Sequence, residues 1–512
     1  MKKIYAIMFS VLTLGLASCD MDKTPYDAIP DTEALQSYTD FVNMRTGLYS
    51  PLRGVNTGTY LLATELMADN FNAVVGFSNT YGVLHRWQQD TQSGEFETIW
   101  GGFQTLISRA NYIIDYSEKV DLTDEELFDA DQVKEIRQII GEAYFIRAYA
   151  IFNLAQFFCA DFEAKSAGEA NSGVAFSLHY APTSDNSQYP ARATLADTYA
   201  QIKSDIDAAK PLIPTEPTSL NEANPQAYIS QDVITALEAR VALAMDDYAT
   251  AAAKAVQLIS SDAYALCANA DELIEMWQND NTPEAIWQLP IPSANELASQ
   301  TGIVFLPYTA GSTPDYIPSG DLLSVFSRND YRVQAYFKVD QLNTTNGTSG
   351  YVYEFNKYAD KTTAVYERLG IEDSRFQNEP KVFRIAEMYL IAAEAYAQAG
   401  NVSEAAKYLN DLQAKRFADF IRQDYSSTTE LMNEIKDERR RELLGEGTRL
   451  FDLKRWHQGV SRTSTQQDDL CLFPGSSITT NLVKSANDPK MIFPIPKAET
   501  DANPQIVQNP GY

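Results

Sequence analysis

The sequence predicts a mainly α-helical protein built from repeated helix pairs, with one loop-rich segment inserted among them. Apolar residues recur at helical spacing over most of the chain. On the same faces, small residues alternate with aromatic ones, so neighbouring helices can approach closely, which is the packing logic of tetratricopeptide repeats. The texture changes between about 282 and 376, where tyrosine, glycine and asparagine replace the helical pattern.

The chain begins with a segment that we interpret as a bacterial lipoprotein signal. Two lysines precede a short apolar run over 4–16, and small residues lead into Cys19. The run is too short to span a hydrocarbon core of about 30 Å. We predict that 1–18 is a signal peptide, that Cys19 is acylated, and that 19–32 tethers a domain covering 33–512. A plain secretory signal is the alternative.

The expected helices follow one another with few interruptions. They span 33–53, 96–117, 132–158, 195–210, 231–245, 248–260, 385–399 and 403–416. We expect three antiparallel pairs: 96–117 with 132–158, 195–210 with 231–245, and 385–399 with 403–416. The last pair is the clearest, because each helix carries one apolar face and Gly400-Asn401 provides the turn. Between the first two helices, 54–94 is predicted to be irregular.

The loop-rich segment over 282–376 divides the domain into an N-terminal part (about 33–260) and a C-terminal part (about 282–512). Within it, 285–290 alternates like a short strand, and 343–350 is a turn of low complexity. Loops held on a rigid scaffold are where binding residues usually lie. We therefore expect this segment to contribute to a binding site.

Composition excludes several classes of function. The 69 acidic residues outnumber the 41 basic ones, and the net charge of −28 repels the phosphate backbone of nucleic acids. After processing, Cys159, Cys267 and Cys471 are too sparse for a disulfide framework. Cys159 and Cys267 stand on apolar stretches and are expected to fill the core.

No pattern for catalysis stands out. The three histidines are not at metal-ligand spacing, and no nucleophile elbow, zinc-protease helix or phosphate-binding loop is present. Glycoside hydrolysis needs only two carboxylates, which 69 acidic residues supply by chance. We predict a binding protein with no enzymatic activity, no metal and no cofactor.

Four local patterns, in order along the chain, resemble the SusD/RagB family. They are Trp100 with Ser108-Arg109-Ala110-Asn111, the helix segment 141–149, the charged stretch from Glu438 to Trp456, and the ending from Phe493 to Tyr512. Gly445 and Leu450 stand where that family is expected to carry bulkier aromatic residues, a departure that concerns packing.

The resemblance implies a function. Members are lipoproteins of the outer membrane that face the cell surface, capture oligosaccharides and deliver them to a SusC-like TonB-dependent transporter, over which they close. The resemblance implies a scaffold of four tetratricopeptide-like repeats with an irregular ligand-binding half. Asp20 and Asp22, directly behind Cys19, look like the acidic export signal of surface lipoproteins of Bacteroidetes. RagB-like peptide binding and a pure protein–protein scaffold are the alternatives, and the loop-rich segment argues against the scaffold.

Sugar recognition calls for flat aromatic side chains beside a few polar groups, and 69–88 contains this mixture. The resemblance also implies that the irregular stretch after the first helix lines the glycan site. The predicted ligand-binding residues are Asp69, Asn72, Tyr81, Arg86, Trp87, Tyr308 and Tyr316. Trp87 is the first choice for a stacking platform and Tyr81 the second. The alternative for Trp87 is a core aromatic that anchors the next helix.

The charged stretch near the C-terminus has a structural interpretation. Several of its residues stand three or four positions apart, which predicts ion pairs on a helix surface. They are Glu438, Arg439, Arg441 and Glu442, continued by Arg449, Asp452 and Arg455 around Trp456. We expect these residues to support the fold, not to contact ligand.

Overall fold

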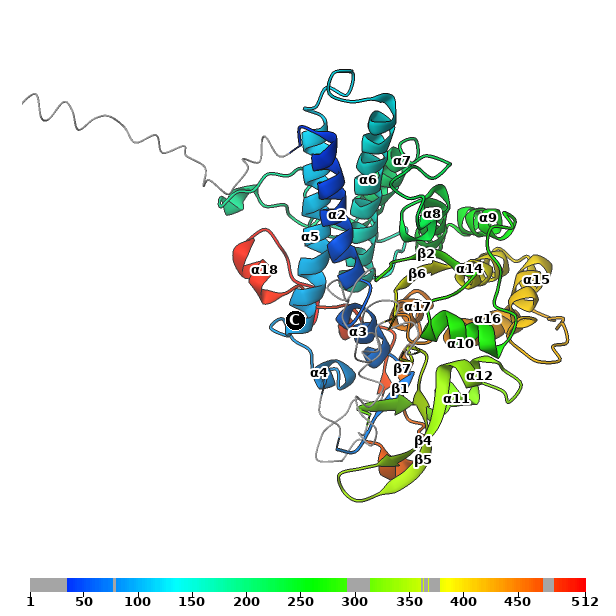
Figure 1. Cartoon of the computed structure of the whole chain (residues 1–512). Helices are drawn as coiled ribbons and strands as arrows, with labels where there is room; N and C mark the ends of the chain where they lie inside the picture. Colours follow the sequence, from blue (N-terminus) through cyan, green and yellow to red (C-terminus); the bar gives the residue numbers. More distant parts are fainter. Residues whose placement is uncertain are drawn as a thin grey trace, which may run out of the picture.

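The fold is mainly α-helical, as predicted (Figure 1). The computed structural model describes residues 35–76, 80–291, 314–360, 362, 367, 378–472 and 483–512. Its longer helices are α2 (Tyr38–Gly54), α3 (Thr59–Met67), α5 (Gly94–Ser117), α6 (Ala130–Phe158), α7 (Leu195–Ala209), α8 (Gln231–Ala244), α9 (Tyr248–Ile259), α10 (Ala270–Gln278), α14 (Ile385–Gln398), α15 (Val402–Gln413), α16 (Thr428–Glu442) and α17 (Arg449–Arg455). Short helices are α4 (Gly82–His85), α11 (Gly320–Ser324), α12 (Arg332–Tyr336) and α18 (Lys497–Ala502).

Local sequence explains where the main helices begin. Asp129 accepts a hydrogen bond from the backbone N–H of Gln132, whose side chain bonds back to the backbone of Asp129, a capping box that starts α6. Ser230 caps α8 and Asn401 caps α15, each by accepting one hydrogen bond from a backbone N–H of the first turn. In α6, Gly141 allows close packing, because a Cβ there would lie 2.8 Å from the Cβ of Leu212.

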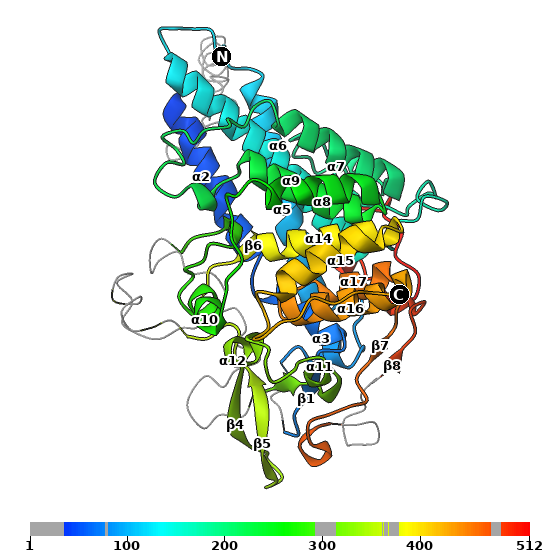
Figure 2. The same ribbon diagram turned by 90° about the vertical axis from the view of Figure 1, so that its right-hand side faces the viewer.

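The helices stack in layers, as Figure 2 shows from α6 and α7 down to α16. The predicted pairs α5–α6 and α14–α15 are confirmed, and α14 packs on both α9 and α16. The predicted pairing of 195–210 with 231–245 is wrong. Instead, α7 packs along α6 and α8 packs along α9. The long α6 is buried on most of its surface, so it offers an apolar side to α7 as well as to α5.

The described residues also form four small antiparallel sheets. They pair β1 (Phe71–Ala73) with β3 (Tyr316–Pro318), β2 (Ala285–Gln288) with β6 (Lys381–Arg384), β4 (Phe337–Asn343) with β5 (Ser349–Phe355), and β7 (Val460–Ser461) with β8 (Val483–Lys484). The predicted strand over 285–290 is confirmed as β2, and the predicted turn over 343–350 joins β4 to β5. The stretch 54–94 is less irregular than predicted, because it contains α3 and α4.

Buried groups agree with most expectations about the core. Cys159, Cys267 and Cys471 are buried free thiols. Trp277 is 2% exposed and Trp287 is completely buried. Within the described ranges, no helix is both long and apolar enough to cross a membrane.

The charged residues near the C-terminus form a buried network. Two of the ion pairs expected within a helix are present, Arg441 with Glu438 at 2.7 Å and Arg455 with Asp452 at 2.8 Å, but their side chains are largely buried and many of their partners come from other elements. We call this network the ionic junction. It comprises Arg332, Lys357, Arg384, Arg416 and Arg441 with Glu284, Asp330, Glu438, Glu442 and Glu446. Arg416 donates to Glu442 at 2.8 Å and to Glu284 at 2.7 Å. The junction ties α12, β6 and the end of α15 to α16, which supports the predicted structural role.

Candidate ligand-binding cavity

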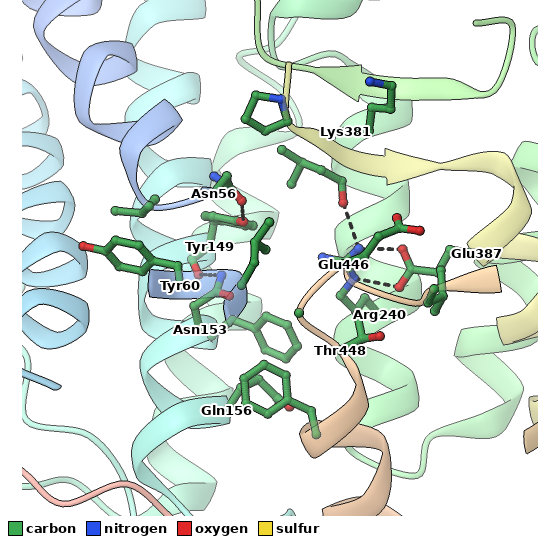
Figure 3. Close-up of a pocket in the computed structure, with 18 of the residues that line it drawn as sticks. Asn56, Tyr60, Tyr149, Asn153, Gln156, Arg240, Lys381, Glu387, Glu446 and Thr448 are labelled. Atoms are coloured by element: carbon green, nitrogen blue, oxygen red, sulfur yellow. Dashed lines mark hydrogen bonds and ion pairs between the residues drawn. The ribbon is translucent and has the colours of Figure 1, made fainter. Parts of the chain in front are cut away.

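A cavity lies where the helical stack meets the ionic junction. Its volume is about 140 Å³. Its walls come from distant parts of the chain, including the end of α2, α3, α6, α8, β6 and the segment 446–455. Figure 3 shows α6 on one side and Arg240, Glu387 and Glu446 facing it from the other.

The α6 wall presents amide groups. Tyr149, Asn153 and Gln156 stand at positions i, i+4 and i+7, so they share one face of the helix. The Tyr149 hydroxyl donates to the side-chain carbonyl of Asn56, and Asn153 Nδ2 donates to the Tyr149 backbone oxygen at 2.8 Å. Gln156 Nε2 donates to the Tyr199 hydroxyl at 3.0 Å. From the described residues, Asn153 Oδ1 and Gln156 Oε1 accept no hydrogen bond, so both can accept one from a ligand.

Two half-buried aromatic rings flank these amides. Tyr60 packs edge-on against Phe103 at 5.4 Å, and Phe451 packs edge-on against Phe157 at 5.0 Å, measured between ring centroids. The Tyr60 hydroxyl donates to the backbone oxygen of Thr98 at 2.7 Å. Burial raises the pKa of Tyr60 to about 12, so the hydroxyl remains a neutral donor. The edge-on packing fixes each ring while part of its surface remains exposed.

The opposite wall is charged, but its charges compensate one another. Arg240 binds Glu387 through two hydrogen bonds of 2.9 and 2.5 Å. Glu446 accepts from Lys357 at 2.7 Å and from Arg384 at 2.6 Å. The remaining pairs are Arg455 with Glu394 and Asp452, Arg439 with Asp452, and Lys381 with Asp280. Glu379 also lines the cavity, and its carboxylate accepts from the Gln288 amide at 2.7 Å and from the Ile291 N–H at 3.1 Å. Every ionic group of the described lining therefore has at least one polar partner, and the cavity favours a neutral, hydroxyl-rich ligand over a charged one.

Asp69 and Asn72 lie away from this cavity. The Asp69 carboxylate binds Arg449 through two hydrogen bonds of 2.8 Å. Burial raises the pKa of Asp69, but Arg440 and Arg449 outweigh that effect and lower it well below its usual range. Asn72 is buried in β1 and donates to the backbone oxygen of Arg462 at 3.3 Å. Both side chains hold segments together in this structure.

Trp87 does not offer an exposed ring. It is 2% exposed, its φ is +56°, and the ammonium group of Lys484 lies 5.3 Å from its ring centroid. Lys490 also donates to the Trp87 backbone oxygen at 3.3 Å. The C-terminal segment thus covers this residue, and the alternative of a core aromatic fits the structure.

Tyr316, Tyr81 and Arg86 are not part of the cavity lining. Tyr316 is completely buried in β3, and its hydroxyl donates to the Thr80 backbone oxygen at 2.6 Å. Tyr81 is half-buried and shares a hydrogen bond of 2.9 Å with Thr59. Arg86 is 8% exposed and donates to Gln88 at 3.0 Å. Tyr308 lies outside the described residues.

The sequence did contain one signal for the cavity that our interpretation missed. Tyr149, Asn153 and Gln156 place polar groups on one face of the C-terminal part of α6, where the other positions over 148–158 are all apolar or small. A polar face inside a buried helix costs free energy unless those groups find partners. Such a face therefore marks a place where a ligand or water meets the core.

In the part of the chain that the structure describes, one group of side chains could hold a cation. The ligand atoms of Asp161, Glu163 and His457 lie within 4.8 Å of one another. Lys165 already binds Glu163 at 2.6 Å, so a cation would have to displace that ammonium group. Nothing further points to a metal there.

Comparisons with known proteins agree with one family over nearly the whole chain. Residues 21–243 match a family model described as "Starch-binding associating with outer membrane", and residues 276–512 match the SusD family model. Two SusD-like proteins from Formosa agariphila are 22% and 24% identical to this chain. The alignments cover 90% and 100% of this chain, and 92% and 100% of those proteins.

Solved structures share the fold. A SusD superfamily protein from Bacteroides thetaiotaomicron is 23% identical, with a TM-score of 0.72 over 93% of this chain and 100% of that one. A SusD-like carbohydrate binding protein from Bacteroides vulgatus is 19% identical, with a TM-score of 0.73 over 92% of this chain and 98% of that one. With the two family models covering both halves in order, the chain belongs to the SusD/RagB family.

Proposed function

We propose that this protein captures neutral oligosaccharides at the outer membrane and passes them to a SusC-like TonB-dependent transporter. The cavity carries the proposal. Its uncommitted amide oxygens on Asn153 and Gln156 suit sugar hydroxyl groups, and the half-exposed rings of Tyr60 and Phe451 suit the apolar faces of sugar rings. Its charged wall is internally neutralised, which disfavours ligands that bring a charge of their own.

The relatives support the same ligand class. One structural neighbour is described as a carbohydrate binding protein, and the family model of the N-terminal half is described as starch-binding. The second description also names an association with the outer membrane. Acylation of Cys19 would anchor the chain there, with the domain facing the cell surface. The division of the domain into an N-terminal part (about 33–260) and a C-terminal part (about 282–512) stays a prediction.

A peptide ligand fits the cavity less well. Peptides carry charged termini and often charged side chains, and each buried charge needs a partner. The Arg240–Glu387 pair and the bonds of Glu446 would have to break to supply one. We therefore place the neutral oligosaccharide ahead of the peptide.

Calorimetric titration tests the ligand class. Purified protein is titrated with oligosaccharides from amylopectin, xylan, galactomannan and laminarin, with an anionic pectin fragment, and with a casein hydrolysate. We expect one neutral oligosaccharide to bind with micromolar to millimolar affinity, about −8 to −4 kcal/mol. Asn153→Ala and Tyr60→Ala should each weaken that binding about tenfold, because they remove an acceptor and a ring face. Exposed Asn224 provides the matched control, Asn224→Ala.

Three results would contradict the proposal: heat only with peptides, heat only with the anionic fragment, or neutral-sugar binding that both cavity variants leave intact. The anchor is tested separately by Cys19→Ala. We expect this variant to leave the outer-membrane fraction, because it lacks the acylated thiol. Co-purification of the wild type, from outer membranes, with a TonB-dependent barrel would support the proposed partner.

A further inference from the structure

The β4–β5 hairpin has an unusual outward face. In its register, Val339 lies opposite Tyr353 and Gln341 lies opposite Tyr351, so these four side chains share one face. Antiparallel sheets that pack one face on a core ordinarily place polar side chains on the other face. Here Val339, Tyr351 and Tyr353 are 60%, 70% and 39% exposed. We call these four residues the hairpin platform.

The other face of the hairpin is packed on the body of the protein. Leu342 and Val352 are buried with Val74, Ile317 and Leu470. Figures 1 and 2 both place the hairpin at the end of the molecule away from the helical stack. The platform therefore points outward from a sheet that is fixed from behind, and none of its residues lines the cavity.

Side-chain amides fix the outer edge of β5. The Tyr353 N–H donates to Gln466 Oε1 at 2.8 Å, and Gln466 Nε2 donates back to the Tyr353 oxygen at 2.9 Å. Gln467 Nε2 donates to the Tyr351 oxygen at 2.8 Å. Gly350 permits this approach, because a Cβ there would lie 2.2 Å from Gln467 Oε1. The backbone that carries both rings is thus ordered before any ligand binds, which lowers the entropic cost of binding.

The chemistry of the platform selects its ligand class. Its four side chains are uncharged in a chain with a net charge of −28. Tyr351 and Tyr353 are two residues apart on a strand, so their Cα atoms are roughly 6.8 Å apart and the rings lie side by side. Phe337 packs edge-on against Tyr353 at 6.2 Å and supports that ring. Gln341 adds an amide beside Tyr351. Flat rings with an adjacent amide suit a neutral sugar chain.

The extent of the platform argues against a protein partner. Stable protein–protein interfaces bury about 800 Å² on each side and involve roughly 20 to 30 residues. Four side chains on a two-stranded hairpin fall well short of that size. A cluster of solvent-exposed aromatic residues nevertheless marks a binding site for some ligand.

We infer that Val339, Gln341, Tyr351 and Tyr353 form a second carbohydrate-binding surface, which holds neutral polysaccharide independently of the cavity. This inference rests on the proposed function, because both sites take the same class of ligand. Two sites on one chain raise the avidity for a long polymer and leave the affinity for a short fragment unchanged. That difference separates the platform from the cavity in an experiment.

The test compares polymer with fragment. Electrophoretic retardation is measured in gels containing amylopectin, xylan, galactomannan or laminarin, and a trisaccharide of the retained polymer is titrated by calorimetry. The double variant Tyr351→Ala/Tyr353→Ala should lose at least about tenfold in polymer affinity. Its trisaccharide affinity should stay within about twofold of wild type. Tyr351→Phe/Tyr353→Phe should keep polymer binding, because the ring faces remain.

Leu127→Ala and Ile421→Ala, which shorten exposed apolar side chains elsewhere, are the matched controls. Retention that is equal in wild type and in the double alanine variant overturns the platform and leaves the cavity proposal intact. A parallel loss of trisaccharide binding also overturns it, because the hairpin would then belong to one continuous site. Self-association that the double variant abolishes would assign the face to a second copy of the chain. Failure of the wild type to bind any polymer or trisaccharide overturns both proposals.

Discussion

The helical stack and the ionic junction hold this protein together by different means. In the stack, α5, α6 and α7 bury apolar side chains whose contributions are graded and independent of pH. In the junction, five cations and five carboxylates are buried together, and each depends on its partners. The cavity lies between the two regions and takes its open amides from the stack and its neutralised wall from the junction. In the proposed function, the α6 wall binds the ligand, whereas the ion pairs of the opposite wall stabilise the fold.

The largest effect is expected where the junction loses one charge. Arg416 uses its guanidinium to bind Glu442, Glu284 and the Cys267 backbone oxygen, and its side chain is fully buried. Arg416→Met leaves buried carboxylates uncompensated, so we expect a loss of about 3–5 kcal/mol in the free energy of unfolding. Urea denaturation measures this loss.

Arg422 is the matched control. It pairs with Asp411 at 2.8 Å, but its side chain is 57% exposed. Arg422→Met should change the free energy of unfolding by about 0–1 kcal/mol. Equal losses in the two variants would mean that burial of the junction does not determine its energetics.

The second largest effect is expected when the pH is lowered, because acid protonates carboxylates of the ionic junction. Burial raises the pKa of Glu438, but the charges of Arg332 and Arg441 outweigh the effect of burial and lower this pKa to about 2. The pKa is near 4.3 in the unfolded chain, so the folded protein gains stability above that pH and loses it as pH falls toward 2. The contribution is about 3 kcal/mol.

Urea midpoints of wild type and Glu438→Gln, measured between pH 7 and pH 3, test this linkage. The difference between the two proteins should shrink as the pH falls, because the wild-type carboxylate is progressively protonated. A difference that stays constant over this range would show that Glu438 does not contribute through its charge.

Sequence periodicity predicted the stack well, and its errors have physical causes. The helices α14 and α15 were located within a few residues, because each has one apolar face and a glycine turn joins them. The helix α3 was missed, because it has only nine residues, and six consecutive ones are buried without a clear apolar stripe. We predicted that α7 packs against α8, but it packs against α6. The spacing of apolar residues shows which face of α7 is buried, but it does not show which helix covers that face.

The described residues among those predicted to bind ligand lie outside the cavity lining for a different reason. Exposure of an aromatic residue depends on segments far away in sequence, and Trp87 is covered by Lys484 and Lys490. Asp69 has the polar character of a ligand contact, yet it binds Arg449, 380 positions later. A single sequence reveals the chemistry of these side chains but not their distant partners.

The smallest effect is expected in the stack, and it completes the comparison with the junction. Ile146 is fully buried in the middle of α6. Ile146→Val removes one methylene group and should cost about 0.5–1.5 kcal/mol in the free energy of unfolding. The loss should be the same at pH 7 and pH 4, because no charge is involved. Ile140→Val, at a half-buried position of the same helix, should cost less. A loss at Ile146 that changes with pH would show that the stack and the junction are energetically coupled.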